Sequence, residues 1–170
     1  MGMKKPAVVE IIGQSGAGKT TLIERLIPEI RKRGVRLAVI KHTSHRHELD
    51  RPGKDSHRLR KAGAEVVLVS SPALFALFRE VQEELTLEEI LSHVPLEIDI
   101  VLAEGYKSHP YPAIEIYRPP VSRELLAHTR QNIRAIVTEA SINTHLPVFP
   151  PHQTAEIAEF ILSFMVQEGR

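Results

Sequence analysis

Apolar residues along the chain alternate between short continuous runs and stretches with helical spacing. Continuous runs predict buried β-strands, whereas apolar positions that recur every three or four residues predict amphipathic helices. The runs predict strands at residues 7–12, 35–40, 65–70, 97–104, 113–117, 133–137 and, more briefly, 147–149. The spaced positions predict helices at residues 20–33, 55–62, 86–94 and 123–130, and a C-terminal helix marked by Ile157, Phe160, Ile161 and Phe164. Residues 74–78 form a short apolar segment whose pattern fits both a strand and a helix.

Four residues refine the boundaries of the predicted helices. Pro28 lies inside the first helix, where it removes one backbone hydrogen bond, so we expect a kink or a break there. Gly34 follows the same helix and is suited to end it. Thr86 and Glu89 have the spacing of a capping box, which predicts the start of the third helix.

Strands that alternate with helices predict an α/β fold, in which a mostly parallel twisted sheet carries helices on both faces. A chain of 170 residues is most simply one domain, so we expect residues 1–170 to form a single domain. Ligands of such sheets bind beyond the carboxyl ends of the strands. Glycine or polar residues follow these ends at residues 13, 41–43, 104–105 and 138–139. The sequence therefore predicts a binding site at this edge of the sheet.

The most informative of these segments is residues 13–20, which read G-Q-S-G-A-G-K-T and fit the P-loop pattern G-x-x-x-x-G-K-[ST]. The segment lies between a predicted strand and a predicted helix, which is the context that phosphate binding requires. Glycines let backbone N–H groups turn inward around phosphates, the lysine reaches the outer phosphates, and the hydroxyl binds Mg²⁺. The candidate nucleotide contacts are Gly13, Ser15, Gly16, Ala17, Gly18, Lys19, Thr20 and Thr21. We therefore predict a three-layer fold of the P-loop NTPase type, with Lys19 in catalysis and Thr20 on the metal.

A P-loop needs an acidic partner for Mg²⁺, usually a carboxylate at the end of an apolar strand. Glu104 ends such a strand and is the preferred candidate for metal binding and catalysis, whereas Asp99 lies at the wrong end of it. Asp55 follows a polar stretch that is long for a connection between a strand and a helix. It is a candidate for metal binding and catalysis, and also for the N-cap of the next helix. Lys41 and His42 follow the second strand and are candidate phosphate contacts.

The polar stretch after the second strand leaves alternatives open. His42, His45, His47 and His57 suggest a metal cluster, but no acidic or cysteine ligand stands at a recognised zinc spacing. A solvated polar loop is therefore the preferred interpretation. Asp50 is a further candidate for holding Mg²⁺ through water, if this loop closes over a nucleotide.

Composition narrows the class of protein without naming its chemistry. The formal net charge is +1 and aromatic residues make up 5% of the chain, so we expect no nucleic-acid partner. The chain has no cysteine, which excludes disulfides, thiolate metal sites and cysteine nucleophiles. No apolar run approaches the about 20 residues of a membrane span, and the first residues lack the apolar core of a signal peptide. We therefore expect a cytoplasmic protein that does not enter a membrane.

Several blocks of the sequence, taken in order, resemble a known family. They are G-Q-S-G-A-G-K-T-T-L at residues 13–22, K-H-T at 41–43, D-R-P-G-K-D-S at 50–56, A-G-A at 62–64 and E-G-Y-K at 104–107. Together with His45, these blocks resemble molybdopterin-guanine dinucleotide biosynthesis protein B (MobB), and the similarity is collinear from about residue 7 to about residue 140. The P-loop alone indicates only a nucleotide-binding protein, whereas the other blocks in this order are much more specific.

The resemblance implies a GTP-binding protein that uses Mg²⁺, has weak GTPase activity and is generally a homodimer. Such proteins assist a partner guanylyltransferase that joins GMP to molybdopterin in molybdenum-cofactor biosynthesis, so molybdopterin or its guanine dinucleotide form is a further candidate ligand. The resemblance also implies that Glu104 acts near the metal and that Asp55 belongs to a loop over the nucleotide. Thr138 and Glu139 are further candidate nucleotide contacts, and Glu139 stands where a guanine-binding protein could carry Asp. A carboxylate there would accept hydrogen bonds from the guanine N1–H and N2–H₂ groups.

Two other functions would use the same residues. A small-molecule kinase would bind a phosphoryl acceptor with Lys41, His42 and the polar loop, and would transfer the γ-phosphate to that acceptor rather than to water. A nucleotide-regulated metallochaperone would use the histidines of the loop. For the dimer that the resemblance implies, the apolar segments 74–78 and 114–117 are candidate edge strands for pairing between subunits.

Overall fold

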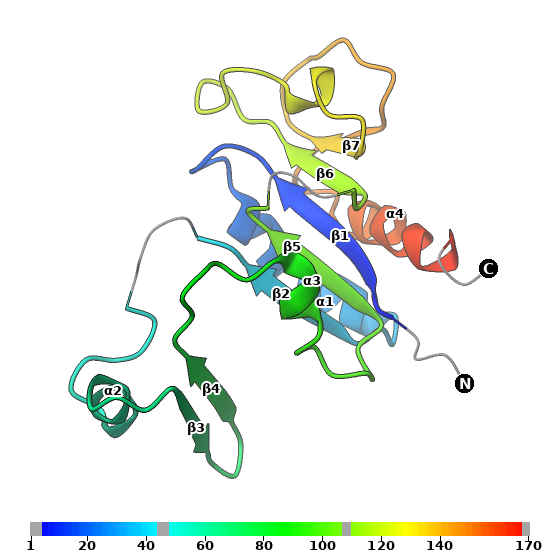
Figure 1. Ribbon diagram of the computed structural model, residues 1–170. Coiled ribbons are helices and arrows are strands. Elements are labelled where there is room, and N and C mark those ends of the chain that lie inside the picture. The colour runs from blue at the N-terminus through cyan, green and yellow to red at the C-terminus, as the bar shows by residue number, and fades with distance from the viewer. Residues whose placement is uncertain (1–4, 44–47, 107–109, 168–170) are drawn as a thin grey trace. The chain divides into compact units, whose positions relative to one another are not determined.

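The computed structural model describes residues 5–43, 48–106 and 110–167, and the chain divides into two compact units (Figure 1). The first unit combines residues 1–43 with residues 94–170, and the second consists of residues 44–93. The single domain expected over residues 1–170 stays a prediction. The two units are groups of residues that pack together, and this packing does not determine whether either unit folds alone.

The first unit is built on a six-stranded sheet in which every pairing is parallel. Its strand order is β2-β5-β1-β6-β7-β8, so β1 lies near the middle (Figure 1). The strands are β1 Ala7–Ile12, β2 Leu37–Lys41, β5 Ile100–Glu104, β6 Ala113–Ile116, β7 Ile133–Val137 and β8 Val148–Phe149. The predicted mostly parallel α/β sheet is confirmed. Because β6 lies between β1 and β7, the prediction that residues 114–117 form an edge strand between subunits is wrong.

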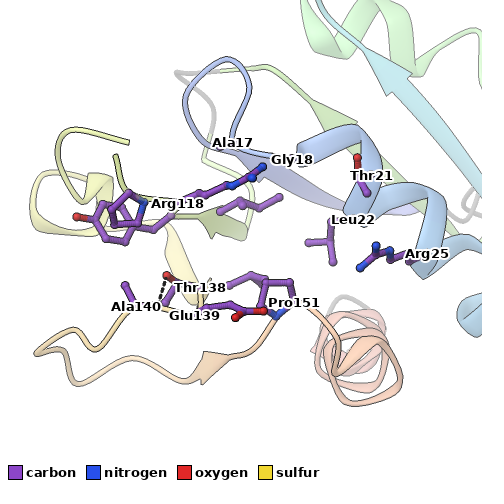
Figure 2. Close-up of a pocket in the computed structure, with 14 residues that line it drawn as sticks. Ala17, Gly18, Thr21, Leu22, Arg25, Arg118, Thr138, Glu139, Ala140 and Pro151 are labelled. Atoms are coloured by element: carbon purple, nitrogen blue, oxygen red, sulfur yellow. Dashed lines mark hydrogen bonds between the residues drawn. The ribbon is translucent and has the colours of Figure 1, made fainter. Parts of the chain in front are cut away.

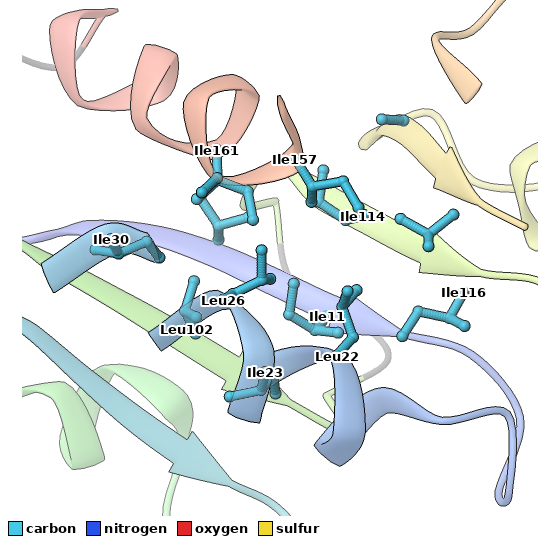
Figure 3. Close-up of a cluster of buried hydrophobic side chains, with 14 of the residues drawn as sticks. Ile11, Leu22, Ile23, Leu26, Ile30, Leu102, Ile114, Ile116, Ile157 and Ile161 are labelled. Carbon is cyan, nitrogen blue, oxygen red and sulfur yellow. The ribbon is translucent and has the colours of Figure 1, made fainter. Parts of the chain in front are cut away.

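Helices α1, Lys19–Lys32, and α4, Thr154–Gln167, contact each other and pack on the same face of this sheet (Figure 3). On α1, Leu22, Leu26 and Ile30 recur at helical spacing and are buried. Burying an aliphatic side chain of this size stabilises a fold by about 1.5–3 kcal/mol. Pro28 lies on the exposed side of α1, where water can solvate the carbonyl that it leaves unpaired, and the predicted break does not occur.

Around β1, β6 and β7, the described residues that cover the opposite face of the sheet are coil and one short 3₁₀-helix. Alternate residues of the same strands point to this face, and Ile12, Ala113 and Ile136 form a second core there with Leu125. The helix predicted at residues 123–130 is wrong, since only the 3₁₀-helix η1, Leu126–His128, forms there.

Tertiary contacts at both ends explain why this segment makes a single turn. At its start, the buried carboxylate of Glu115 accepts hydrogen bonds from the backbone N–H groups of Leu126 and Ala127, at 2.7 and 2.8 Å. At its end, Asn132 donates to the carbonyl of Tyr111 at 2.9 Å, immediately before β7 begins. Tertiary contacts at both ends of the segment therefore override its helical propensity.

The second unit contains the helices α2, Asp55–Lys61, and α3, Leu87–Leu91, and the strands β3, Val66–Ser70, and β4, Phe75–Arg79. Strands β3 and β4 form an antiparallel two-stranded sheet, so the ambiguous segment 74–78 is a strand. The capping box of α3 is confirmed, because the Thr86 hydroxyl accepts from the Glu89 N–H while the Glu89 carboxylate accepts from the Thr86 N–H. Among the described residues of both units, no helix is long and apolar enough to cross a membrane.

Candidate functional site

The glycine-rich turn occupies residues 13–18, between the end of β1 and the start of α1. Gly13 has a φ of 146°, and a Cβ atom built on it would lie 2.6 Å from the carbonyl oxygen of Ile116 on β6. A side chain at this position would push β6 away from the turn. Close packing of the sheet against the turn therefore requires glycine here. The N-terminal end of α1 follows directly, with the N–H of Leu22 donating to the carbonyl of Gly18 at 2.9 Å.

Lys19, the first residue of α1, folds back over this turn. Its Nζ donates hydrogen bonds to the carbonyl oxygens of Gly13 and Gln14, both at 3.0 Å. The ammonium group is thus held at the rim of the turn whose backbone N–H groups are the predicted phosphate ligands. A phosphate in the turn would offer Lys19 charged acceptors in place of these two carbonyl oxygens.

Thr20 and Glu104 meet at the carboxyl edge of the sheet. The Thr20 Oγ1 atom lies 3.0 Å from both carboxylate oxygens of Glu104, the last residue of β5. Glu104 is 7% exposed. A hydroxyl and a carboxylate supply the hard oxygen ligands that Mg²⁺ prefers, so this donor set fits the ion. Asp99, at the other end of β5, accepts a hydrogen bond from the backbone N–H of Arg36 at 3.0 Å, which agrees with its rejection as a metal ligand.

Lys41 completes this group from the neighbouring strand. It ends β2, and in the parallel pairing of β2 with β5 it stands opposite Glu104. Its Nζ lies 3.2 Å from the Thr20 Oγ1 and 3.8 Å from the Glu104 Oε1. The sequence predicted that each of these residues lies at a strand end or in the P-loop, and the structure brings all three together.

The residues after Lys41 and Glu104 are packed against each other. The N–H of His42 donates to the carbonyl of Glu104 at 2.8 Å, which continues the strand pairing by one residue. Gly105 has a φ of 91°, and a Cβ atom on it would lie 2.9 Å from the His42 carbonyl oxygen. The rings of His42 and Tyr106 lie 5.0 Å apart, centre to centre. The K-H-T and E-G-Y blocks therefore form one piece of structure.

Beside the P-loop lies a cavity of about 630 Å³. Figure 2 shows that it is bordered by the first turn of α1, by Arg118 after β6 and by Thr138 and Glu139 after β7. Thr138 is buried, and its hydroxyl accepts a hydrogen bond from the Ala140 N–H at 3.0 Å, whereas Glu139 is exposed. Thr138 and Glu139 were predicted as nucleotide contacts. The remaining polar lining was not predicted: Arg25, Tyr117 and Arg118.

Asp55 and Asp50 belong to the second unit. Asp55 is highly exposed and lies 3.5 Å from the Arg58 guanidinium. The N-cap of α2 is Lys54 and Asp55 is its first residue, so the prediction of Asp55 as N-cap is wrong by one position. Its predicted part in metal binding and catalysis stays a prediction. Asp50 is buried, accepts a hydrogen bond from the Ser56 hydroxyl at 3.0 Å and lies 3.6 Å from the Arg60 Nε, so it holds its own loop together.

The two histidines of this group that the structure describes belong to different units. His42 lies in the first unit against Tyr106, whereas His57 lies in the second unit, where its ring is 3.6 Å from a Glu48 carboxylate oxygen. His45 and His47 lie outside the described residues. Within residues 5–43, 48–106 and 110–167, no group of three His, Cys, Asp or Glu side chains could hold a metal ion.

The protein is an α/β protein of the P-loop NTPase-like class. Its parallel sheet carries a glycine-rich turn after the first strand, a helix starts at the lysine of that turn, and the acidic end of another strand lies beside it. Comparison with known proteins specifies the family. The model of the family "Molybdopterin guanine dinucleotide synthesis protein B" (MobB) matches residues 8–139. This match covers more than half of the chain, which therefore belongs to the MobB family.

Relatives and solved structures agree with this assignment. The molybdopterin-guanine dinucleotide biosynthesis adapter protein of Escherichia coli is 35% identical over 160 residues, which cover 91% of each chain. The protein of the same name from Haemophilus influenzae is 32% identical over 156 residues, or 91% of this chain and 87% of that protein. A crystal structure of molybdopterin-guanine biosynthesis protein B superposes with a TM-score of 0.75 at 33% identity, over 92% of this chain and 98% of that one. The crystal structure of Bacillus subtilis MobB gives a TM-score of 0.74 at 31% identity, over 93% and 97% of the two chains.

Proposed function

We propose that this protein binds GTP with Mg²⁺ at its P-loop and acts as an adaptor in molybdopterin guanine dinucleotide biosynthesis, where it assists the guanylyltransferase that joins GMP to molybdopterin. The observation that carries the proposal is the Thr20–Glu104 contact, with a distance of 3.0 Å from the hydroxyl to each carboxylate oxygen. This contact lies at the start of α1, next to a cavity large enough for a nucleotide base and ribose.

The P-loop would hold the phosphates. Backbone N–H groups of residues 13–18 and the N-terminal end of α1 provide the anion site, and Lys19 would exchange its two carbonyl partners for phosphate oxygens. Thr20 and Glu104 would hold Mg²⁺, which neutralises negative charge on the phosphate oxygens when it is bound. The roles of these residues follow from their positions and from the chemistry of their side chains.

The cavity beside α1 would take the guanine base. Glu139 offers a carboxylate at its rim, and guanine presents two N–H donors, N1–H and N2–H₂, to such an acceptor. Adenine lacks this pair of donors on the corresponding edge, so a carboxylate at this place would favour GTP over ATP.

Hydrolysis should be slow. Lys41 pairs with Glu104, and the arginines Arg25 and Arg118 line the base cavity. Without an arginine finger, P-loop GTPases turn over on the order of 10⁻⁴–10⁻³ per second. A turnover near 10 per second without any partner would contradict the adaptor role.

We further propose that the adaptor is a homodimer. The two-stranded sheet β3–β4 and its connecting turn expose six large apolar side chains: Val66, Leu68, Val69, Leu74, Phe75 and Leu77. An isolated two-stranded sheet is marginally stable in water, and exposed apolar strand edges favour pairing with another strand. A second copy of the chain is the proposed partner. Light scattering should give twice the monomer mass, and Leu68→Glu should lower it to the monomer mass.

A titration with fluorescent GTP and ATP analogues tests the nucleotide proposal. The wild type should bind GTP in a Mg²⁺-dependent manner, and Lys19→Ala should abolish this binding. Glu139→Gln should reduce the preference for GTP by about tenfold, since a hydrogen bond to a charged group contributes about 1.5–3 kcal/mol. The matched control is Glu124→Gln, an exposed carboxylate away from the cavity lining. Equal affinity of the wild type for ATP and GTP would refute the base assignment.

A second experiment tests the adaptor role. Purified guanylyltransferase and this protein should form a complex in crosslinking or sedimentation, and the complex should assemble GMP with molybdopterin faster than the transferase alone. Lys19→Ala should lose the acceleration. Binding of GTP without any complex or acceleration would leave a nucleotide-binding protein and would exclude the adaptor role.

A further inference from the structure

The magnesium site of the proposed function already contains a positive charge from the chain itself. The Lys41 ammonium lies 3.2 Å from the Thr20 hydroxyl and 3.8 Å from a Glu104 carboxylate oxygen. These are the two groups that would hold the ion. A divalent cation and an ammonium cannot both occupy this space without strong repulsion, because like charges about 4 Å apart repel even at a protein surface.

We propose that Lys41 is an exchangeable counter-ion of Glu104: it neutralises the carboxylate in the nucleotide-free protein, is displaced when Mg²⁺ enters with a nucleotide, and then binds the terminal phosphate. The inference rests on the proposed function, since it deepens the role of the same site. Its consequence is that Mg²⁺ alone binds weakly, whereas Mg²⁺ together with a triphosphate binds well.

Burial explains why Glu104 needs such a counter-ion. Glu104 is 7% exposed, and an ionised carboxylate taken out of water is costly unless it is paired and hydrogen-bonded. The Thr20 hydroxyl supplies only one proton to the two carboxylate oxygens. Lys19 donates hydrogen bonds to the carbonyl oxygens of Gly13 and Gln14. Lys41 forms an ion pair with Glu104, with its Nζ 3.8 Å from the Oε1 atom.

The side chain of Lys41 is suited to an exchange. It is 58% exposed, in contrast to the carboxylate that it contacts, so its flexible stem can move without disturbing the core. Its backbone is fixed by the parallel pairing with β5, in which it stands opposite Glu104. An ammonium on a four-carbon stem is a compact charge with three donors, which can leave a carboxylate and bind a phosphate by rotation about side-chain bonds.

The first test measures metal binding without nucleotide. Mn²⁺ is titrated into the full-length protein and the free ion is followed by electron paramagnetic resonance. Lys41→Met should bind Mn²⁺ about fivefold more tightly than the wild type, which corresponds to the upper range for an exposed ion pair. Lys41→Arg should bind it as weakly as the wild type. The control Lys32→Met removes an exposed lysine that pairs with Glu29, and it should leave Mn²⁺ binding unchanged.

Two results of this titration would overturn the inference. A gain of less than twofold in Lys41→Met would show that the ammonium does not compete with the metal. A gain that persists in the double variant Lys41→Met with Glu104→Gln would place the ion elsewhere. Circular dichroism should show the wild-type fold in Lys41→Met, because the replaced side chain is mostly exposed.

The second test measures the exchange with nucleotide present. In Mg²⁺, the ratio of the GDP to the GTP dissociation constant should fall about tenfold in Lys41→Met, since the terminal phosphate loses a charged partner. Lys32→Met should keep the wild-type ratio. An unchanged ratio in Lys41→Met would refute the transfer of Lys41 to the phosphate. If the wild type bound no nucleotide, the proposed function and the transfer would both fail, while the Mn²⁺ titration would still decide whether Lys41 and the metal compete.

Discussion

The buried carboxyl group of Glu10 should make the stability of this protein fall as the pH rises from 5 to 8. Glu10 lies on β1 with 0% exposure. Its Oε2 accepts a hydrogen bond from the Asn132 side chain at 3.3 Å, and its Oε1 has no partner among the described residues. Burial raises the pKa of Glu10 to about 7, although the Arg130 charge and the Asn132 hydrogen bond act in the opposite direction. The neutral carboxyl group is therefore the form that fits the folded protein.

The sign and size of the effect follow from the two pKa values of this group. In the unfolded chain the pKa is the ordinary 4.5, so the folded state holds the proton more tightly. The resulting stabilisation is fully present below about pH 4.5 and is lost as the pH rises to about 7. Each pH unit in this window removes about 1.4 kcal/mol, which gives a total of about 3 kcal/mol. This is a large part of the about 5–15 kcal/mol that stabilises a typical domain.

Urea unfolding at pH 5, 6, 7 and 8 would measure the effect in Glu10→Gln, which keeps the shape of the side chain and cannot ionise. At pH 8 the variant should be more stable than the wild type by about 2–3 kcal/mol, whereas at pH 5 the two should agree within about 1 kcal/mol. Glu124→Gln is the control, because Glu124 is exposed. Parallel stability curves for the wild type and Glu10→Gln across this range would refute the reasoning.

Two further variants test how the site and the opposite face are built. Gly13→Ala should lower the free energy of unfolding by about 2 kcal/mol or more, because its Cβ would lie 2.6 Å from the Ile116 carbonyl oxygen. Gly34 also has a positive φ, but a Cβ atom on it would have no other atom within 4 Å, so Gly34→Ala should lower the free energy of unfolding by only about 1 kcal/mol. Equal losses of stability in the two variants, measured by urea unfolding, would contradict the steric argument. Glu115→Gln should cost about 1–2 kcal/mol, because an amide offers one acceptor to the two N–H groups of η1. Unchanged stability of Glu115→Gln would show that these bonds contribute nothing.

The strands were predictable because a parallel sheet covered on both faces produces continuous apolar runs. Glu10 shows the limit of this signal, since one charged residue inside the run of β1 leaves the pattern intact. Its environment comes from Asn132, which is 122 positions further along the chain. The helix predicted at residues 123–130 fails for a related reason. The Glu115 carboxylate binds backbone N–H groups of that segment, and Asn132 just beyond its end binds the Tyr111 carbonyl. Neither contact is visible in the sequence of the segment itself.

The candidate site was predictable wherever its residues follow a strand. That rule identified Lys41, Glu104 and Glu139. Applied to β6 as well, it would have identified Arg118, which follows the strand predicted at residues 113–117 and lines the cavity. Arg25 could not be found in this way, because it lies on a helix and an exposed arginine on α1 carries no local signal of a ligand. Its place in the cavity lining depends on how α1 packs against the sheet.

Two of the blocks that carry the family resemblance, K-H-T and E-G-Y, are distant in sequence but form a single support for the proposed metal site. Lys41 and Glu104 are partners in the pairing of β2 with β5, and the bond from the His42 N–H to the Glu104 carbonyl extends that pairing. Gly105 allows the His42 carbonyl to approach, and Tyr106 packs its ring against the His42 ring. These contacts fix the backbone under Lys41 and leave its ammonium group at the end of a mostly exposed stem. An exchange of cations at Glu104 therefore requires rotation of one side chain and no rearrangement of the sheet.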